Sequence, residues 1–489
     1  MKKPAGVNGI KSMISKLFLV SGVIMMVLFG VGPTYSASTQ TGVVATVAPD
    51  WSSAAHSVIS VDPVGGPRSV SNDLLPTSTS DITVNAYGKY FYRIERYQSD
   101  SVTKFDVSSP GTPIWQYSTL DTGEGDSSNP HDLVFVSSTK AYLTRYGSTK
   151  AWVVNPSTVT EAGFKIGELD LSSYADADGV PEMTGGVIAN GKLFIILQRL
   201  DSSFCPSNMA YVAVFDVATD TEIDTGLGQG GKKGIPLPIK NPLSIQYLSQ
   251  NNTIYVQGVG SFPGFCSSEY EYTGGIASIN PITYATGMVL DDGDSTDHPY
   301  GVISGMMIAS PQKGYFVGYD GWKDNTLYKF NPSTGVVAGA LDGFKGISIS
   351  GMESGTYLDK NDMLWVCNQT AYTVDIVDTK DNTIDESVST SLSPQRVAFC
   401  TSGAPLAPTL GATVAGTAVL AHWDTVSGAD GYYLWVTFPD SLYSVIFNMG
   451  TVTSVSATLW SGASCYIAVI PFNAEGSGTG SNVVHVAVD

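Results

Sequence analysis

One short pattern recurs along the chain and constrains the fold more than any other feature. Each copy is a run of β-forming residues, then Asp or Asn, then a turn residue, as in Val102–Asp106 and Val212–Asp216. Asp or Asn favours a turn, because its side chain can accept a hydrogen bond from the backbone two residues later. The pattern predicts seven related units, whose Asp or Asn residues are Asp62, Asp106, Asn155, Asp216, Asn280, Asn331 and Asp378, at intervals of 44, 49, 61, 64, 51 and 47 residues.

A β-rich segment such as Lys192–Ile196 precedes each of these strands, around Gly42–Ala48 in the first unit. In the later units an inner strand such as Asp132–Val136 precedes that segment. Several short strands in a repeat of roughly 40–50 residues are typical of β-propeller blades. We therefore expect an all-β fold whose main part, residues 42–400, is a seven-bladed β-propeller. Its first unit lacks an inner strand, and Pro394–Cys400 is expected to supply it, so that strands from both ends of the domain close the ring and leave no open sheet edge.

Within each unit the strands are termed a (inner), b, c and d (outer). Because strand direction alternates, the b→c and d→a loops lie on one face of the ring, which we call the loop face. Cys205 and Cys266 lie in b→c loops of adjacent units, which predicts a disulfide between them. Pairing of Cys367 with Cys400 stays open, because connectivity cannot be deduced from sequence. Cys465 lies in an apolar run and is expected to be a buried thiol.

The N-terminal segment, residues 1–36, is predicted to be a secretory signal peptide. It has a basic start, an apolar core over 17–31 and small residues at Thr34–Ser36. An uncleaved N-terminal anchor is the alternative. We expect an exported protein, in the periplasm, on the surface or outside the cell, with no membrane span after cleavage. The net charge of −19 argues against nucleic acid as a partner.

A change in composition marks the C-terminal part. Residues 401–408 have the small-residue and proline content of a linker. Residues 409–489 contain alternating strands such as Val419–Trp423 and resemble a fibronectin type III domain, with Trp423 at its core position and Tyr466 at its tyrosine corner. The resemblance implies a β-sandwich that serves as a spacer or adhesion module, consistent with association with the cell envelope.

Three d→a loops are acidic, including the one with Asp121, Glu124 and Asp126. Clustered carboxylates are the hard oxygen ligands that Ca²⁺ prefers. The candidate calcium ligands are Asp176, Asp178, Asp291, Asp292 and Asp294. The alternative is that these are solvated acidic turns.

Two rings of side chains are candidate ligand-binding positions on the loop face. The inner ring, at the starts of the a strands, includes His131, Asp132, Glu182, Asn241 and His298, and Asp81, Ser350 and Gln395 take the matching positions in other units. This ring suits a metal or polar ligand, or it fixes the blade tops. The second ring, near the ends of the b strands, would suit carboxylate, phosphate or flat-ring ligands, or would neutralise the acidic loops. Its members are Arg96, Arg145, Tyr146, Arg199, Tyr319 and Trp322.

Several segments resemble the YVTN repeat, including Ala141–Arg145, Thr253–Val256 and the turns Asn155–Thr158 and Asn331–Thr334. Over residues 42–400 the chain is similar to secreted bacterial seven-bladed propellers of the YVTN-repeat, surface-layer type. Architectural relatives include propellers that capture vitamin B12, metal-dependent lactonases and streptogramin lyase-like enzymes. Of an enzyme ligand set, only Glu182, Asn241 and His298 could contribute.

We therefore expect an exported, non-catalytic binding or surface-interaction protein that takes a small molecule or a protein at its loop face. One alternative is a metal-dependent enzyme of the lactonase or lyase kind. Another is a structural component of the cell surface.

Overall fold

The computed structural model describes residues 39–488 apart from 122, 124–126, 265, 404, 427–428, 439–443 and 474–475. The predicted signal peptide, and Glu124 and Asp126 of one acidic loop, lie outside the described residues. The chain divides into two compact units, Thr39–Ser402 and a second unit that contains Gly403–Asp489. Within the described part, no helix is both long and apolar enough to cross a membrane.

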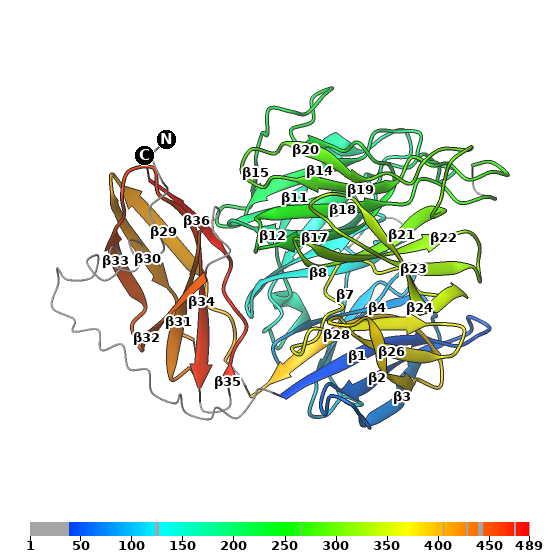
Figure 1. Ribbon diagram of the computed structural model, residues 1–489, viewed down its shortest axis with the longest axis horizontal. Helices are drawn as coiled ribbons and strands as arrows, with labels where there is room; N and C mark the ends of the chain where they lie inside the picture. The colour runs from blue at the N-terminus through cyan, green and yellow to red at the C-terminus, as the bar shows by residue number, and fades with distance from the viewer. Residues whose placement is uncertain are drawn as a thin grey trace, which may run out of the picture. The chain divides into compact units, whose positions relative to one another are not determined.

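In the described part of Thr39–Ser402 the strands form seven antiparallel sheets, and the unit is propeller-like (Figure 1). Each sheet is mostly built from strands that follow one another in the chain. The first three sheets, each in its pairing order, are β28 (Ser393–Ser402), β1 (Thr39–Val47), β2 (Ala54–Ser60) and β3 (Val70–Thr77); β4 (Ile82–Tyr87), β5 (Tyr90–Glu95), β6 (Ser101–Asp106) and β7 (Pro113–Ser118); and β8 (Pro130–Ser137), β9 (Lys140–Arg145), β10 (Lys150–Val154) and β11 (Lys165–Asp170).

The remaining four sheets continue this order. They are β12 (Met183–Ala189), β13 (Lys192–Leu197), β14 (Tyr211–Asp216) and β15 (Thr221–Glu222), with β16 (Ile235–Pro236) beside β14; β17 (Pro242–Leu248), β18 (Thr253–Gly258), β19 (Gly275–Ile279) and β20 (Thr286–Leu290); β21 (Val302–Ser310), β22 (Lys313–Tyr319), β23 (Asn325–Phe330) and β24 (Val337–Ile347); and β25 (Met363–Asn368), β26 (Thr373–Asp378) and β27 (Thr383–Ser389).

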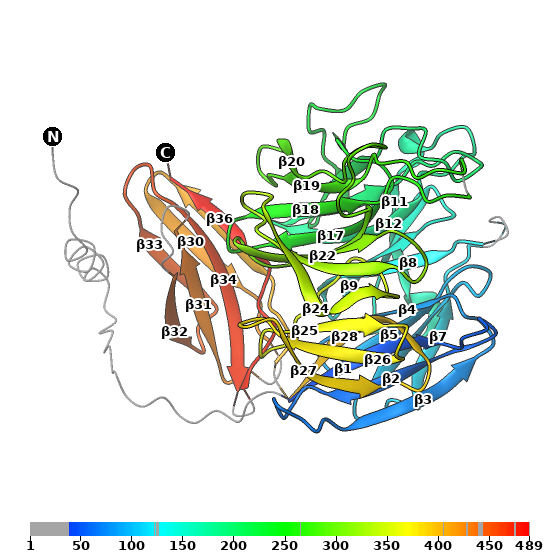
Figure 2. The same ribbon diagram turned by 45° about the vertical axis from the view of Figure 1, so that its right-hand side comes forward.

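The two ends of this unit meet in one sheet, as the sequence predicts. β1 lies between β2 and β28 (Figure 2), and Gly42 pairs with Phe399 and Val43 with Ala398. Because the first and last strands of the unit are neighbours, the backbone hydrogen bonds of β1 are satisfied on both sides.

The recurring Asp or Asn acts as the sequence predicts in six of the seven turns. In each of the six, its Oδ1 accepts a hydrogen bond from the backbone N–H two residues later, as when Asp106 accepts from Ser108 at 2.9 Å. The other five bonds run from Ser157 to Asn155, Ala218 to Asp216, Ile282 to Asn280, Ser333 to Asn331 and Lys380 to Asp378. Asp62 instead forms an ion pair with Lys360 at 2.6 Å.

Adjacent sheets bury their apolar faces against each other. Tyr142 and Val153 of the third sheet pack with Leu193 and Ile195 of the fourth, and all four are at most 2% exposed. Strands between two other sheets are covered on both faces, and in β9, β13 and β18 every residue after the first is buried.

The seventh sheet differs from the expectation, because its described residues provide no inner strand. Ser350 was expected to start that strand, but Ser350–Gly355 is irregular, and only isolated bridges such as Ile349 with Asn368 flank it. Gly355 has a φ of +132°, which suits glycine but not a regular strand. Ser354 contacts Gly185 so closely that a Cβ at that glycine would clash with the Ser354 side chain. This segment therefore packs against β12 instead of extending its own sheet.

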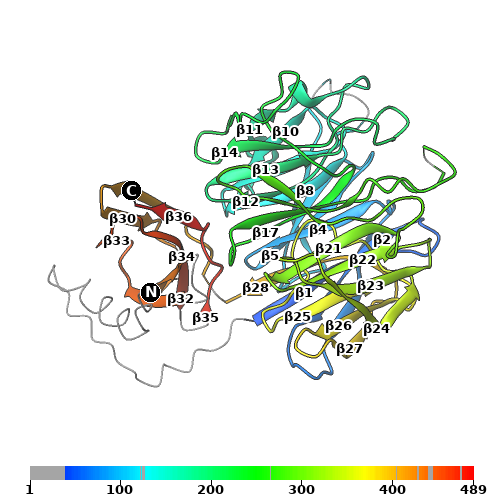
Figure 3. The same ribbon diagram turned by 45° about the horizontal axis from the view of Figure 1, so that its top comes forward.

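The second unit contains two sheets in its described part. One has the order β29 (Leu410–Ala415), β30 (Ala418–Trp423) and β33 (Ser454–Thr458); the other has β32 (Ser444–Gly450), β31 (Gly431–Thr437), β34 (Ser464–Asn473) and β35 (Gly476–Ser477), with β36 (Val484–Ala487) beside β34 (Figure 3). Trp423 and Tyr432 pack in its core with Cys465, all at most 4% exposed. Tyr466 is 9% exposed and lies against His485.

Candidate functional site

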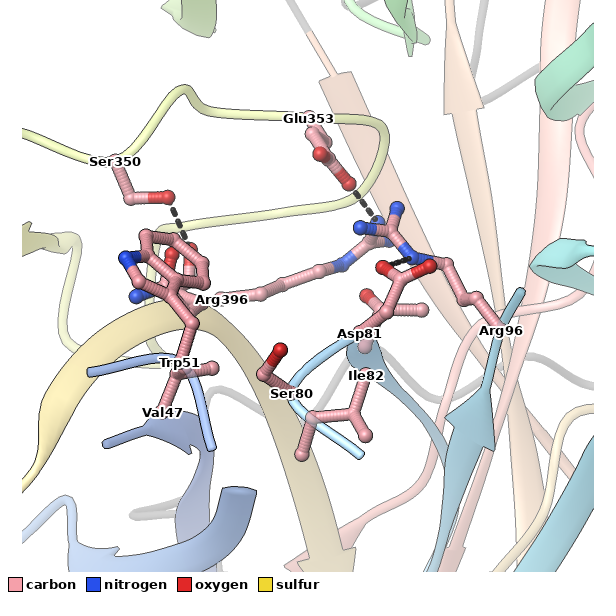
Figure 4. Close-up of a pocket in the computed structure, with 11 residues that line it drawn as sticks. Val47, Trp51, Ser80, Asp81, Ile82, Arg96, Ser350, Glu353 and Arg396 are labelled. Carbon is pink, nitrogen blue, oxygen red and sulfur yellow. Dashed lines mark hydrogen bonds and ion pairs between the residues drawn. The ribbon is translucent and has the colours of Figure 1, made fainter. Parts of the chain in front are cut away.

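A cavity of about 290 Å³ opens among loops of the expected loop face (Figure 4). It lies between the β1→β2 loop, the segment leading into β4, the end of β5, the irregular Ser350–Gly355 segment and the start of β28. The lining residues are Val47, Trp51, Ser80, Asp81, Ile82, Thr83, Arg96, Ser350, Glu353, Gln395 and Arg396. Both b→c and d→a loops contribute, as strand alternation predicts.

Arg96 is held in this cavity by Asp81. Its Nε donates a hydrogen bond to Asp81 Oδ1 at 2.6 Å, and Asp81 Oδ2 accepts one from the Tyr97 N–H at 3.1 Å. Among the described residues, no hydrogen bond uses either terminal amino group of Arg96, and its side chain is 21% exposed. Asp81 therefore fixes the guanidinium and leaves its outer edge to the cavity.

Arg396 forms the floor of the cavity and is 5% exposed. Its guanidinium donates to the Ser354 carbonyl and lies 3.4 Å from Glu353 Oε2 and 3.6 Å from Asp132 Oδ1. These contacts connect β28, the Ser350–Gly355 segment and β8. The side chains of Glu353 and Asp132 therefore flank the Arg396 guanidinium.

Asp132, a predicted ligand-binding residue, is part of this buried network. Its Oδ1 accepts from Asn85 Nδ2 at 2.7 Å, and its Oδ2 accepts from the Gly186 N–H at 3.2 Å. Burial raises its pKa. These bonds hold Asp132 between two other sheets, because Asn85 lies in β4 and Gly186 lies in β12.

The two histidines of the inner ring each stack on a tyrosine. The His131 ring lies 4.7 Å from that of Tyr146, and the His298 ring lies 4.4 Å from that of Tyr272. Burial, with the charges of Arg96 and Arg396, holds the pKa of His131 well below its usual value, so this imidazole is neutral. His298 Nδ1 lies 2.8 Å from the Asp294 carbonyl.

Glu182 and Asn241 each bind backbone groups of their own sheet. Glu182 is 2% exposed, and its Oε2 accepts from the Leu200 N–H at 3.0 Å; burial, with the charges of Asp178 and Asp176, raises its pKa to about 9. Asn241 Nδ2 donates to the Gly260 carbonyl at 2.9 Å. In the described ranges, no three His, Cys, Asp or Glu side chains are grouped as a metal site would require.

The three arginines of the second ring do not share one surface. Arg145 is fully buried over the Trp152 ring, and its Nε donates to the Thr119 carbonyl at 3.0 Å. Arg199 is 8% exposed and donates to the Tyr174 carbonyl at 2.7 Å. Both side chains fasten the preceding d→a loop, and of the three only Arg96 lines the cavity.

The aromatic members of that ring lie nearer the solvent. Tyr146 is covered by His131, as described above. Tyr319 packs edge-on against Phe262 at 4.8 Å. Trp322 is 58% exposed, and its ring lies 6.1 Å from that of Trp51, which lines the cavity.

The predicted calcium ligands mostly accept hydrogen bonds from their own loops. Asp176 Oδ2 accepts from Asn208 at 2.6 Å, Asp178 from the Val180 N–H and Asp291 from the Gly293 N–H. Asp294 Oδ1 accepts from Thr296 Oγ1 at 2.6 Å, and its pKa is lowered by these bonds.

Asp292 differs from the other acidic residues because it is fully buried. Its Oδ2 accepts from the Gly274 N–H at 3.1 Å, and its Oδ1 has no partner among the described atoms. Burial raises its pKa to about 7. Calcium at these loops stays a prediction.

The predicted disulfide is present. Cys205 and Cys266 are bonded, with Cα atoms 5.3 Å apart, and they connect the β13→β14 loop to the β18→β19 loop. Cys367, Cys400 and Cys465 are buried free thiols, so the pairing left open for Cys367 and Cys400 does not occur in the structure.

The sequence predicted Asp81, Ser350 and Gln395 at the starts of inner strands, but it did not predict Trp51, Glu353 and Arg396 as residues of the site. The role of Arg396 could have been predicted, because a charged side chain in an inner strand is buried and therefore needs polar partners. Nothing in the sequence pointed to Glu353, because the repeat pattern predicts a regular strand in a segment where the chain is irregular.

Comparisons with known proteins bear on the fold alone. No family model and no curated protein matches the sequence. Similar solved structures include apo AztD from Citrobacter koseri (11% identity, 75% of this chain and 99% of that one, TM-score 0.44). Others are a putative 6-phosphogluconolactonase from Bacteroides fragilis (12%, 76% and 99%, 0.49) and streptogramin B lyase (16%, 62% and 82%, 0.41). These neighbours are β-propeller-like proteins, and likenesses this distant give no information on the ligand.

Proposed function

We propose that this chain is an exported, non-catalytic binding protein whose loop-face cavity takes a small ligand with an anionic group. In this proposal residues 42–400 are a seven-bladed propeller, and residues 409–489 are a fibronectin type III-like module for surface attachment. The cavity, about 290 Å³, is close to the lower end of the size range of small-molecule sites, so a compact ligand fits best.

The observation that carries the proposal is the state of Arg96. Arg96 lines the cavity, and its Nε is bound to Asp81, whereas no hydrogen bond within the described part of the chain uses its terminal amino groups. A planar guanidinium with one edge open is suited to bind a carboxylate or phosphate through two parallel hydrogen bonds. Because Asp81 already fixes the side chain, little conformational entropy is lost on binding.

Trp51 adds an apolar surface to the same cavity. It lines the same cavity and is 50% exposed, so a flat or aliphatic part of the ligand can pack on its ring. Ser80, Ser350 and Gln395 supply the polar groups that would orient the ligand. The combination favours a small organic acid over an inorganic ion.

Thermal unfolding of the purified protein against a panel of small carboxylates and phosphorylated metabolites tests this function. A ligand at 100 times its dissociation constant should stabilise the fold by about 2.7 kcal/mol. Arg96→Gln should abolish the shift. Lys380→Gln, at an exposed turn on the other face of the sheets, is the matched control and should retain the shift. Equal shifts in Arg96→Gln and wild type would reject the cavity as the site.

The metal-dependent enzyme alternative has its own test. Glu182→Gln with His298→Ala should abolish turnover of lactones or lyase substrates while the fold persists, if that alternative holds. For the structural alternative, deletion of residues 401–489 should release the protein from the cell envelope. Unchanged envelope association would reject that role of the C-terminal unit.

A further inference from the structure

Five aromatic side chains lie close to one another on the loop face, in two short segments of the chain. Four of them belong to contacting ring pairs, and Trp322 lies in the loop after Tyr319, with its ring 6.1 Å from that of Trp51 at the edge of the cavity. We call this cluster the aromatic crescent; its members are Phe262, Tyr270, Tyr272, Tyr319 and Trp322. They come from the β18→β19 loop and from the end of β22 and the loop after it.

Direct contacts connect the two halves of the crescent. Tyr319 packs against Phe262 at 4.8 Å, and the Tyr270 hydroxyl donates to the Asp320 carbonyl at 2.9 Å. Tyr270 and Tyr272 rings lie 6.0 Å apart. The Cys205–Cys266 disulfide ties the first loop to its neighbour. The crescent is therefore braced by covalent and hydrogen bonds.

These rings are not fully covered by the fold. Trp322 is 58% exposed, and the other four side chains are partly exposed. Clustered exposed aromatic rings are uncommon on monomeric proteins and mark interaction sites, because water-exposed apolar surface is unfavourable.

The charges around the crescent are mainly negative. Burial raises the pKa values of Tyr270 and Tyr272, and Asp320 adds to both shifts, which places its carboxylate near both rings. Burial and the neighbouring Asp324 also raise the pKa of Asp320. Among the described residues, Asp320, Asp324 and Glu269 form no ion pair. Lys323 is the one cation of the short loop 320–324.

We propose that the aromatic crescent binds a basic peptide segment that carries lysine and arginine side chains. Aromatic faces attract cations, and unpaired carboxylates beside them complement the charge of such a segment. Two loops supply the rings, so the surface suits an extended chain that offers several cations in a row. This inference goes beyond the proposed function, because it uses other residues and a partner of opposite charge.

Fluorescence anisotropy of a labelled nonalysine peptide with the purified protein tests the proposal. The peptide should bind, with an affinity that falls as salt rises, and a nonaglutamate peptide should not bind. Trp322→Ala should weaken binding about tenfold, and Trp322→Phe should restore most of it, because both rings have a cation-binding face. Asp320→Asn should weaken binding about fivefold at low salt and flatten its salt dependence.

Two matched controls separate the crescent from general acidity. Trp460→Ala removes a tryptophan that is 47% exposed in the other unit, and Asp342→Asn removes an exposed carboxylate on β24; neither should change the affinity. Unfolding midpoints equal to wild type would show that the variants fold.

Four results would overturn the proposal. They are an unchanged affinity in folded Trp322→Ala, equal binding of nonaglutamate, binding of acetyl-lysine amide as tight as that of the peptide, and binding of cellohexaose without binding of nonalysine. The third would assign the crescent to a small organic cation and the fourth to a neutral glycan. Arg96→Gln should leave peptide binding unchanged. The cavity proposal and the crescent proposal can therefore fail independently of each other.

Discussion

The guanidinium of Arg396, near the start of the closing strand β28, lies 3.6 Å from the carboxylate of Asp132 in β8. Both side chains are at most 5% exposed. The closing strand β28, which belongs to the first sheet, is thus connected through a charge pair to β8 of the third sheet. Glu353 and the Ser354 carbonyl complete the partners of Arg396, so the irregular segment of the seventh sheet depends on the same residue.

Loss of Arg396 is expected to destabilise the protein strongly. Arg396→Met removes one partner of a buried pair and leaves Asp132 without its nearest cation, which typically costs about 3–5 kcal/mol. Urea unfolding measures the change. Lys380→Met, at an exposed turn, is the control and should shift the free energy of unfolding by less than about 0.5 kcal/mol. A loss below about 1 kcal/mol in Arg396→Met would show that the network adds little to stability.

The Cys205–Cys266 disulfide should stabilise two loops that the fold otherwise leaves exposed. It closes a span of 61 residues, for which chain entropy predicts about 4 kcal/mol as an upper value. Cys205→Ser with Cys266→Ser should therefore lower the free energy of unfolding by about 2–4 kcal/mol. Dithiothreitol should lower the free energy of unfolding of the wild type by the same amount. It should not change that of the double variant. Cys465→Ala changes a buried free thiol and is the control for reagent effects.

Much of the fold follows from local chemistry in the sequence. In six of the seven units the Asp or Asn after the c strand accepts a backbone hydrogen bond in its turn, so the spacing of these residues reports the repeat directly. Closure by residues 393–402 was predictable, because a missing inner strand at one end requires a strand from the other. The disulfide between Cys205 and Cys266 was predictable for another reason: alternating strand direction places their two loops on one face of adjacent units.

The candidate site was less predictable, because side-chain direction depends on packing between sheets. Arg96, Arg145 and Arg199 occupy similar places at the ends of b strands, yet Arg145 and Arg199 turn inward to backbone carbonyls and Arg96 pairs with Asp81. The sequence does not encode that difference locally. Glu353 reaches the cavity only because Ser350–Gly355 leaves the strand pattern.

Glu182 should make stability fall as pH rises. Its pKa is about 9 in the folded state, against an ordinary value of 4.5. Between these values the folded state holds a proton that the unfolded state has released, so the slope of unfolding free energy with pH is negative. Glu182→Gln removes this term. Because one proton changes the free energy of unfolding by about 1.4 kcal/mol per pH unit, the variant should gain up to about 4 kcal/mol over wild type between about pH 5 and about pH 8. Urea midpoints across this range measure it, with Glu269→Gln as the exposed control.

Asp292 provides the most direct test for calcium. Its folded pKa is about 7 against an ordinary value of 3.8, so without a cation the folded state holds an extra proton in that window and stability falls as pH rises through it. A bound Ca²⁺ requires the ionised carboxylate, and with calcium present stability should instead rise with pH.

Thermal unfolding with EDTA or with millimolar calcium, at about pH 5 and about pH 8, separates these cases. Calcium should raise the midpoint at the higher pH, and metal analysis of the purified protein should find a stoichiometric amount. Asp292→Asn should remove the calcium effect, whereas Asp342→Asn should keep it. If calcium leaves the midpoint unchanged at the higher pH, Asp292 acts only as a buried, titrating acid. The calcium prediction for these loops would then be wrong, and Arg96 would remain the residue on which to search for ligands.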